Sequence, residues 1–259
     1  MGRTLSRDDL REHKEKALQK LEDYIDSLIN NPDPKIQSKA DKLSYWLEDW
    51  SKFLSFEPEF HSDSLRRYKR GEIIKAHLGY NVGSEEGGLH YCVVIDKKNS
   101  IYSPVMTVVP LTSVKPTTDL ENLKKGNIYL GNELFTNLSS KISTNKKNLD
   151  LHITNIEEQI KKIKRLASNA DISAELNSLN EDLKSARKEE LLLLRMIKEV
   201  SKMRKGSIAL VAQITTISKI RIYDPKTNYD ILSNVKLSNE KLDLIDQEIL
   251  QNFTGKKQK

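Results

Sequence analysis

Four polar residues near the ends of two apolar segments could act together on a phosphodiester. His90 follows the Gly87–Gly88 pair and begins an apolar run, whereas Thr112, Ser113 and Lys115 end a later one. An imidazole can move protons near neutral pH, hydroxyls can orient a phosphate, and an ammonium can stabilise developing negative charge. These groups need no metal when a ribose 2′-hydroxyl is the nucleophile. The alternative is structural, because a histidine beside a Ser/Thr-rich turn is commonly part of the fold.

Other common chemistries lack their motifs. The five histidines have no HxH or HxxxH spacing, and the single cysteine, Cys92, excludes an intrachain disulfide and a multi-cysteine zinc site. Neither a phosphate-binding Walker loop nor a GxSxG turn occurs in the sequence. The glycine-rich VGSEEGGLH segment (82–90) joins two expected strands instead of opening a helix. We therefore expect neither a metal nor any other cofactor.

Short β-type segments would position these residues. Alternating apolar residues rich in Ile, Val and Tyr predict strands, which Gly and Pro residues separate. The expected strands lie in 71–78, 89–96, 102–113 and 126–130, with one or two more in 205–224. Their number and shortness predict a small, strongly bent antiparallel barrel.

Helical patterns surround and interrupt the expected barrel. Apolar residues at helical spacing predict helices at 5–31 and 35–55, separated by NNPDP, and a closing helix at about 238–253. Within 140–204, two further helices carry a heptad-like apolar seam, with a polar break at Ser168–Asp171, which predicts an antiparallel coiled-coil hairpin. The predicted organisation is a helical hairpin (1–62), a barrel with a C-terminal helix (63–139 and 205–259) and an inserted coiled-coil hairpin (140–204).

Charge and hydropathy set broad limits on the protein class. The 259 residues have a net charge of +6, yet acidic residues outnumber basic ones in 1–60, so the positive excess lies elsewhere. A basic remainder permits a nucleic-acid partner without requiring one. No apolar signal region opens the chain, and no run approaches the roughly 18 apolar residues of a membrane span. We expect a soluble cytoplasmic protein.

Three segments carry a resemblance to a known family. RRYKRGEIIKAHLGYNVGSEEGGLHYCVVIDKKNSIYSPVMTVVPLTS (66–113) resembles the N-terminal half of the MazF/PemK (Kid) toxins, with their "RGD/E" start, "GSEQGG" loop, "VVI" strand and "SP…V…T" strand. KGSIALVAQITTISKIRI (205–222) is similar to the family's "SVxLxEQIRTIDKxRL" segment, and 237–253 is similar to its closing helix. Together these segments span 83 residues.

This resemblance implies a type II toxin–antitoxin toxin with an α+β fold built on an SH3-like antiparallel barrel. Such toxins are usually dimeric, metal-independent endoribonucleases that cleave single-stranded RNA, leaving 2′,3′-cyclic phosphate and 5′-hydroxyl ends. It also implies a cognate antitoxin as partner. Thr112 occupies the position of the family's catalytic threonine, whereas His90 stands where the family has an arginine. Either histidine shuttles protons in place of the arginine, or this branch has impaired catalysis.

PLTSVK (110–115) is similar to a Pro-Leu-Thr-Ser-x-Lys segment of ToxN-type ribonuclease toxins, which share the barrel. This likeness implies that Thr112, Ser113 and Lys115 work with His90. Thr215 replaces the arginine of the family's "EQIRT" pattern, next to a matching Gln213. Gln213 and Thr215 are predicted RNA contacts. The other predicted RNA contacts are Arg70 and Lys75, just before and within the first expected strand, and Ser84 and Glu85, in the loop that follows it.

Two alternatives stay open. The barrel could be a non-catalytic binding module or, like CcdB, a poison of DNA gyrase. The acidic N-terminal helices could cover a basic RNA groove as a built-in inhibitor, or, together with the inserted hairpin, extend a homodimer interface. An RNA-cleavage assay separates the enzyme from the binding module.

Overall fold

The computed structural model describes residues 5–166 and 172–255, and these form two units. One contains the helices that precede Phe60 together with Leu78–Gly88, and the other contains His61–His77 and the chain from Leu89 onward. The predicted break at Ser168–Asp171 lies outside the described residues. No helix within the described ranges is both long and apolar enough to cross a membrane.

The first unit contains two helices, close to their predicted ranges. α1 (Arg7–Ile29) begins at a capping box, in which the Ser6 side chain accepts from the Asp9 N–H and Asp9 accepts from the Ser6 N–H. α2 (Pro34–Phe56) begins after Asp33, whose side chain caps the helix, and has proline in its first turn. Both starts satisfy N–H groups that a helix leaves unpaired.

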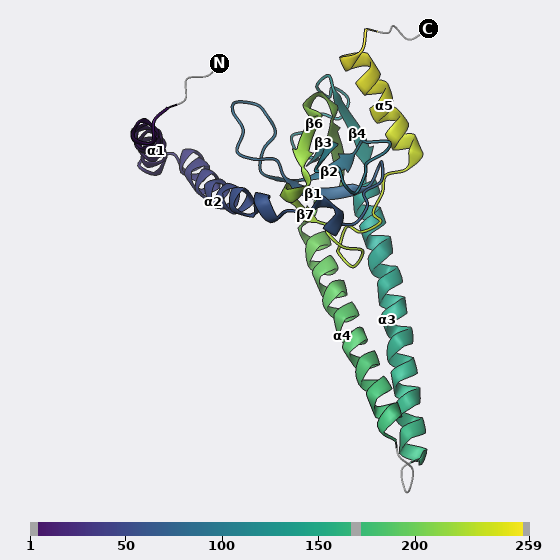
Figure 1. The fold of residues 1–259 in the computed structure, drawn as a ribbon. Helices are drawn as coiled ribbons and strands as arrows, with labels where there is room; N and C mark the ends of the chain where they lie inside the picture. The colour runs from purple at the N-terminus through teal and green to yellow at the C-terminus, as the bar shows by residue number, and fades with distance from the viewer. Residues whose placement is uncertain (1–4, 167–171, 256–259) are drawn as a thin grey trace. The chain divides into compact units, whose positions relative to one another are not determined.

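A seven-stranded antiparallel sheet forms the centre of the second unit (Figure 1). Its strands are β1 (Ile73–His77), β2 (Leu89–Val94), β3 (Val105–Ser113), β4 (Asn127–Gly131), β5 (Ser207–Leu210), β6 (Thr215–Ser218) and β7 (Ile222–Asp224). The order is β4-β5-β3-β2-β1-β7, and β6 pairs with β3. The α+β class is therefore as predicted. The closed barrel is wrong, because β4 and β7 end the order without pairing among the described strands.

The strand prediction also differs within 205–224. This stretch forms three strands, because the 3₁₀ turns Val211–Gln213 and Lys219–Arg221 interrupt it. β5 pairs with the last residues of β3, and β6 pairs with its first four. Pro110 lies between these two pairings, and proline has no N–H to donate to a strand ladder. The edge of β3 is consequently shared by two short strands.

The hairpin that interrupts the sheet starts earlier than predicted. α3 (Glu133–Leu166) begins almost directly after β4, and α4 (Ser173–Lys202) returns to β5. The helices run antiparallel, since Asn145 contacts Met196, whereas Gln159, further along α3, contacts Asp182, earlier on α4. An apolar seam that includes Leu149 and Leu193 lies between them. A knobs-into-holes coiled coil stays a prediction.

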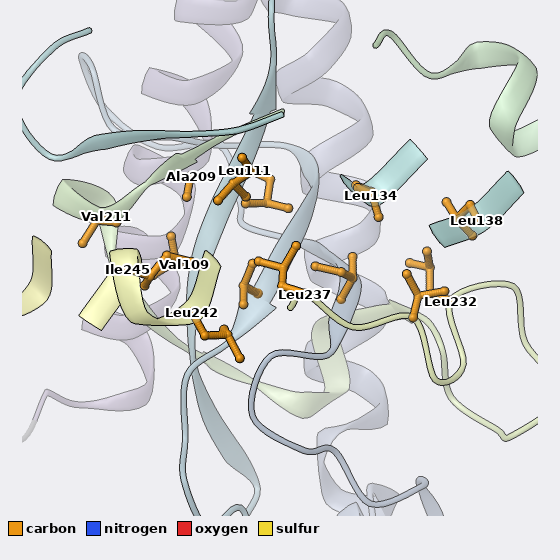
Figure 2. Packing of buried hydrophobic residues seen from close by; sticks show 14 residues of the cluster. Val109, Leu111, Leu134, Leu138, Ala209, Val211, Leu232, Leu237, Leu242 and Ile245 are labelled. Atoms are coloured by element: carbon orange, nitrogen blue, oxygen red, sulfur yellow. The ribbon is translucent and has the colours of Figure 1, made fainter. Parts of the chain in front are cut away.

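The base of the hairpin belongs to the sheet's core. Leu134 and Leu138 of α3 are buried with Val109 and Leu111 of β3, and Leu242 and Ile245 of α5 (Asn239–Phe253) complete the same cluster (Figure 2). Val200 and Met203, at the end of α4, pack against this cluster. The early start of α3 follows from this burial, since a helix continues where its apolar side chains enter a core. The end of α4 is thereby held against the sheet.

Candidate active site

Strand register brings one row of side chains to a single face of the sheet. Lys75 of β1 pairs with Tyr91 of β2, Tyr91 pairs with Leu111 of β3, and Leu111 pairs with Ala209 of β5. Directly opposed residues of antiparallel strands share a face. Ser113 lies two residues beyond Leu111 and is therefore on this face too, opposite Ser207.

A cavity of about 270 Å³ opens on this face at the end of β3. The strands supply one side, and the end of α4 with the following two residues supplies the other. Its lining residues are Lys75, Leu89, Tyr91, Leu111, Thr112, Ser113, Leu134, Glu199, Lys202, Met203, Arg204 and Ser207. Three cationic side chains and one carboxylate give the lining an excess of positive charge.

Gly206 shapes the segment that leads from the end of α4 into β5, beside the cavity. Its φ is +85°, a conformation that side chains disfavour, and a Cβ there would lie 2.8 Å from Val114. The Gly206 carbonyl accepts from the Val114 N–H over 3.1 Å. Glycine thus allows the chain to turn from Arg204 into β5 against the end of β3.

Glu199 organises the floor of the cavity. Lys75 Nζ donates to Glu199 Oε1 over 2.5 Å, and the Tyr91 hydroxyl donates to the same oxygen. Burial raises the pKa of Glu199, but the hydrogen bonds from Lys75 and Tyr91 outweigh it and leave the pKa below its ordinary value. Burial, followed by the contact with Glu199, raises the pKa of Tyr91. At neutral pH the site therefore holds a carboxylate beside a protonated phenol.

His90 and Thr112 belong to the other face of the sheet. Continuing the Tyr91–Leu111 register by one residue puts His90 across from Thr112, and residues so opposed lie side by side. His90 Nδ1 lies 3.2 Å from the carbonyl oxygen of Leu111, the residue before Thr112. Thr112, next to the end of β3, also lines the cavity. The register thus brings together His90 and Thr112, whereas Ser113 lies on the cavity face.

Lys115 does not line this cavity. It is exposed in the loop after β3, where its main-chain N–H donates to the Thr118 hydroxyl over 2.9 Å. Its role, like those of His90, Thr112 and Ser113, stays a prediction.

The predicted RNA contacts are dispersed. Lys75 lines the cavity, whereas Arg70 binds Asp246 of α5 and the Ile95 carbonyl, an arrangement that fastens α5 to the sheet. Gln213 lies in a 3₁₀ turn, and Thr215 begins β6 and is exposed. Ser84 and Glu85 are exposed in the loop between β1 and β2, which belongs to the first unit.

Sequence reasoning missed Tyr91, Glu199, Lys202 and Arg204. The alternation of β2 could have indicated Tyr91, since it must face away from His90. Helical spacing puts Glu199, Lys202 and Met203 on one face of α4. Nothing in the spacing indicates that this face meets β1 and β2. Among the described residues, no cluster of three or more His, Cys, Asp or Glu side chains could hold a metal.

Comparison with known proteins finds a toxin family that part of this chain resembles. Residues 69–183 match the model of a family described as PemK-like, MazF-like toxin of type II toxin-antitoxin system. A search of curated proteins finds no match. The family match confirms the resemblance predicted from the motifs of 66–113, and it covers His90 and Thr112 but not Glu199. The likenesses of 205–222 and 237–253, and of PLTSVK to ToxN-type toxins, stay predictions.

Proposed function

We propose that this chain, whose residues 69–183 resemble PemK/MazF-like toxins, is an endoribonuclease toxin of a type II toxin–antitoxin system. Its substrate is single-stranded RNA. The register that sets His90 beside Thr112 carries the proposal, because a proton-transfer group and a phosphate-binding hydroxyl must lie together for this chemistry. The cationic cavity next to Thr112 supports a polyanionic substrate.

The proposed reaction is an intramolecular phosphoryl transfer. The ribose 2′-oxygen attacks the adjacent phosphorus and gives up its proton, while the bond from phosphorus to the 5′-oxygen breaks and that oxygen takes up a proton. The products are a 2′,3′-cyclic phosphate and a 5′-hydroxyl, and neither water nor a redox partner is consumed.

His90 is the proposed proton-transfer group. A carbonyl oxygen only accepts hydrogen bonds, so the Leu111 carbonyl favours the tautomer with the proton on Nδ1. The imidazole of His90 would accept the 2′-hydroxyl proton and then protonate the leaving oxygen. Thr112 and Ser113 hydroxyls would bind the phosphate oxygens, and Lys115 from the following loop would offset the developing charge.

The same resemblance supports three further proposals about the assembled protein. A type II toxin has a cognate antitoxin, which we propose as a protein partner of this chain. We also propose a homodimer, the usual state in the resembling family, and a cytoplasmic location, where mRNA is available.

The test is cleavage of a long single-stranded RNA in excess EDTA, with the end groups mapped. We expect discrete cuts with cyclic-phosphate ends from the wild type and none from His90→Ala. His13→Ala is the matched control, since His13 is exposed on α1, and it should cleave like the wild type. Intact RNA with folded wild-type protein, or equal cleavage by His90→Ala, would overturn the proposal. Intact RNA would favour a binding module or a gyrase poison.

A further inference from the structure

We propose that the inserted hairpin completes an RNA subsite, in which Lys202 and Arg204 bind a backbone phosphate beside the reaction centre and Tyr223 stacks on a base. This subsite rests on the proposed function for its substrate. Lys202, Arg204 and Tyr223 lie beyond the matched segment, which ends at residue 183. The inserted hairpin thereby has a role in substrate binding.

The charges of the cavity favour an anion. Lys202 and Arg204 are exposed at its rim, on the last turn of α4 and just after it. Lys75 lies deeper, with a side chain only 20% exposed, and Glu199 is 19% exposed. Since Glu199 offsets Lys75 on the floor, the two rim cations are left to attract a ligand from solvent. Hydroxyls of Ser113 and Ser207, paired across β3 and β5, add neutral donors.

The size of the cavity suits one backbone unit of a strand. Its volume of about 270 Å³ lies just below the range of roughly 300–1,000 Å³ typical of pockets for small ligands. A phosphate with its sugar can enter such a space, but a duplex or a folded RNA cannot. Because Thr112 lines the same cavity, a strand bound there lies against the end of β3.

An aromatic ring lies next to Lys75, one of the residues that line the cavity. Tyr223 of β7 is 67% exposed, and Lys75 Nζ lies 5.9 Å from the centre of its ring. The same ammonium lies 5.3 Å from the ring centre of Tyr91, so Lys75 stands between the two tyrosines. An exposed tyrosine next to cations is the usual platform for a base of a single strand.

The test measures binding of a fluorescent 2′-O-methyl oligoribonucleotide, which lacks the nucleophilic hydroxyl and cannot be cleaved. Affinity is followed by anisotropy against salt concentration. Each lost phosphate contact should reduce the slope of log K against log salt by about 0.7. We expect this reduction for Lys202→Ala and for Arg204→Ala. Lys198→Ala, on the same helix but outside the cavity, should keep the wild-type slope.

Further variants test Glu199, at the bottom of the cavity, and the exposed ring of Tyr223. Glu199→Gln keeps a hydrogen-bonding group but removes the negative charge, so it should bind the probe more tightly. Tyr223→Leu should weaken binding about tenfold, and Tyr223→Phe should not, because it keeps the ring. Both residues can change without burying a new charge.

The outcomes separate this subsite from the proposed function. Salt slopes unchanged in both Lys202→Ala and Arg204→Ala would overturn the subsite, even if the wild type cleaves RNA. Reduced slopes would support it, even if the wild type cleaved nothing and the proposed function failed.

Discussion

Lys75 of β1 donates to Glu199 of α4 over 2.5 Å, joining a strand and a helix that lie 124 residues apart in the chain. Tyr91 of β2 donates to the same carboxylate, so one acidic side chain connects β1 and β2 to the inserted hairpin. The hairpin is therefore fastened to the sheet by polar contacts as well as by the apolar cluster around Leu134 and Leu138.

Removing this carboxylate should loosen the base of the hairpin. Glu199→Ala leaves the Lys75 ammonium and the Tyr91 hydroxyl without their shared acceptor in a partly buried place, which costs about 1–3 kcal/mol of unfolding free energy. Urea unfolding measures the loss. Glu190→Ala, an exposed position on α4, is the control and should lie within about 0.5 kcal/mol of the wild type. Equal stability of the two variants would contradict a structural role for Glu199.

Lys141 of α3 provides a second polar fastening, with a pH dependence. Its Nζ donates to the carbonyl oxygens of Asp230, Ile231 and Ser233. Burial lowers its pKa from 10.5 to about 8, against the opposing charge of Asp224. The folded chain thus binds the proton less tightly than the unfolded chain. Between pH 8 and 10.5 unfolding takes up a proton, so the contribution of Lys141 to stability rises with pH across this window.

Lys141→Met should remove this dependence. The difference in unfolding free energy between wild type and variant, followed from below pH 8 toward pH 10, isolates Lys141, because all other titratable groups are common to both proteins. We expect the wild type to gain about 1–2 kcal/mol relative to the variant, less than the full pKa change implies, since the side chain is only half-buried. A difference that stays constant with pH would rule out the lowered pKa.

Much of this architecture could be predicted from the sequence, and the failures have physical causes. Among the described residues, periodicity located the five α-helices and the first four strands, because alternation and helical spacing are local properties. The open sheet, the extra strand and the early start of α3 depend on tertiary packing around Pro110 and Leu134 instead. Glu199 was missed for the same reason, since its partners belong to strands far away in the sequence.

The candidate site, too, could be predicted only in part from the sequence. Motif order within 66–113 pointed to His90 and Thr112, and strand register, which a motif cannot specify, puts them on one face. Their catalytic roles stay predictions. Arg70, by contrast, is a predicted RNA contact, whereas its side chain binds Asp246.

Arg70→Ala should therefore change stability more than RNA affinity. Its partner Asp246 is 44% exposed, so the ion pair contributes about 1 kcal/mol at most, with a further loss from the Ile95 carbonyl contact. A double-mutant cycle with Asp246→Ala measures the coupling. Binding of the uncleavable oligoribonucleotide should keep its wild-type salt slope. A slope reduced by about 0.7 would instead identify Arg70 as a phosphate contact.

Thr112 can be tested by substitutions that keep its shape. Thr112→Val preserves the branched side chain beside Ile208 and removes only the hydroxyl, so the sheet should remain intact. If this hydroxyl binds the reacting phosphate, kcat for RNA cleavage should fall about a hundredfold, as when one preorganised donor is lost. Thr112→Ser restores the hydroxyl and should recover most of the rate. A Thr112→Val protein that is folded by circular dichroism and cleaves at the wild-type rate would show that Thr112 only pairs β3 with its neighbours, and catalysis would then have to rely on His90 and Ser113.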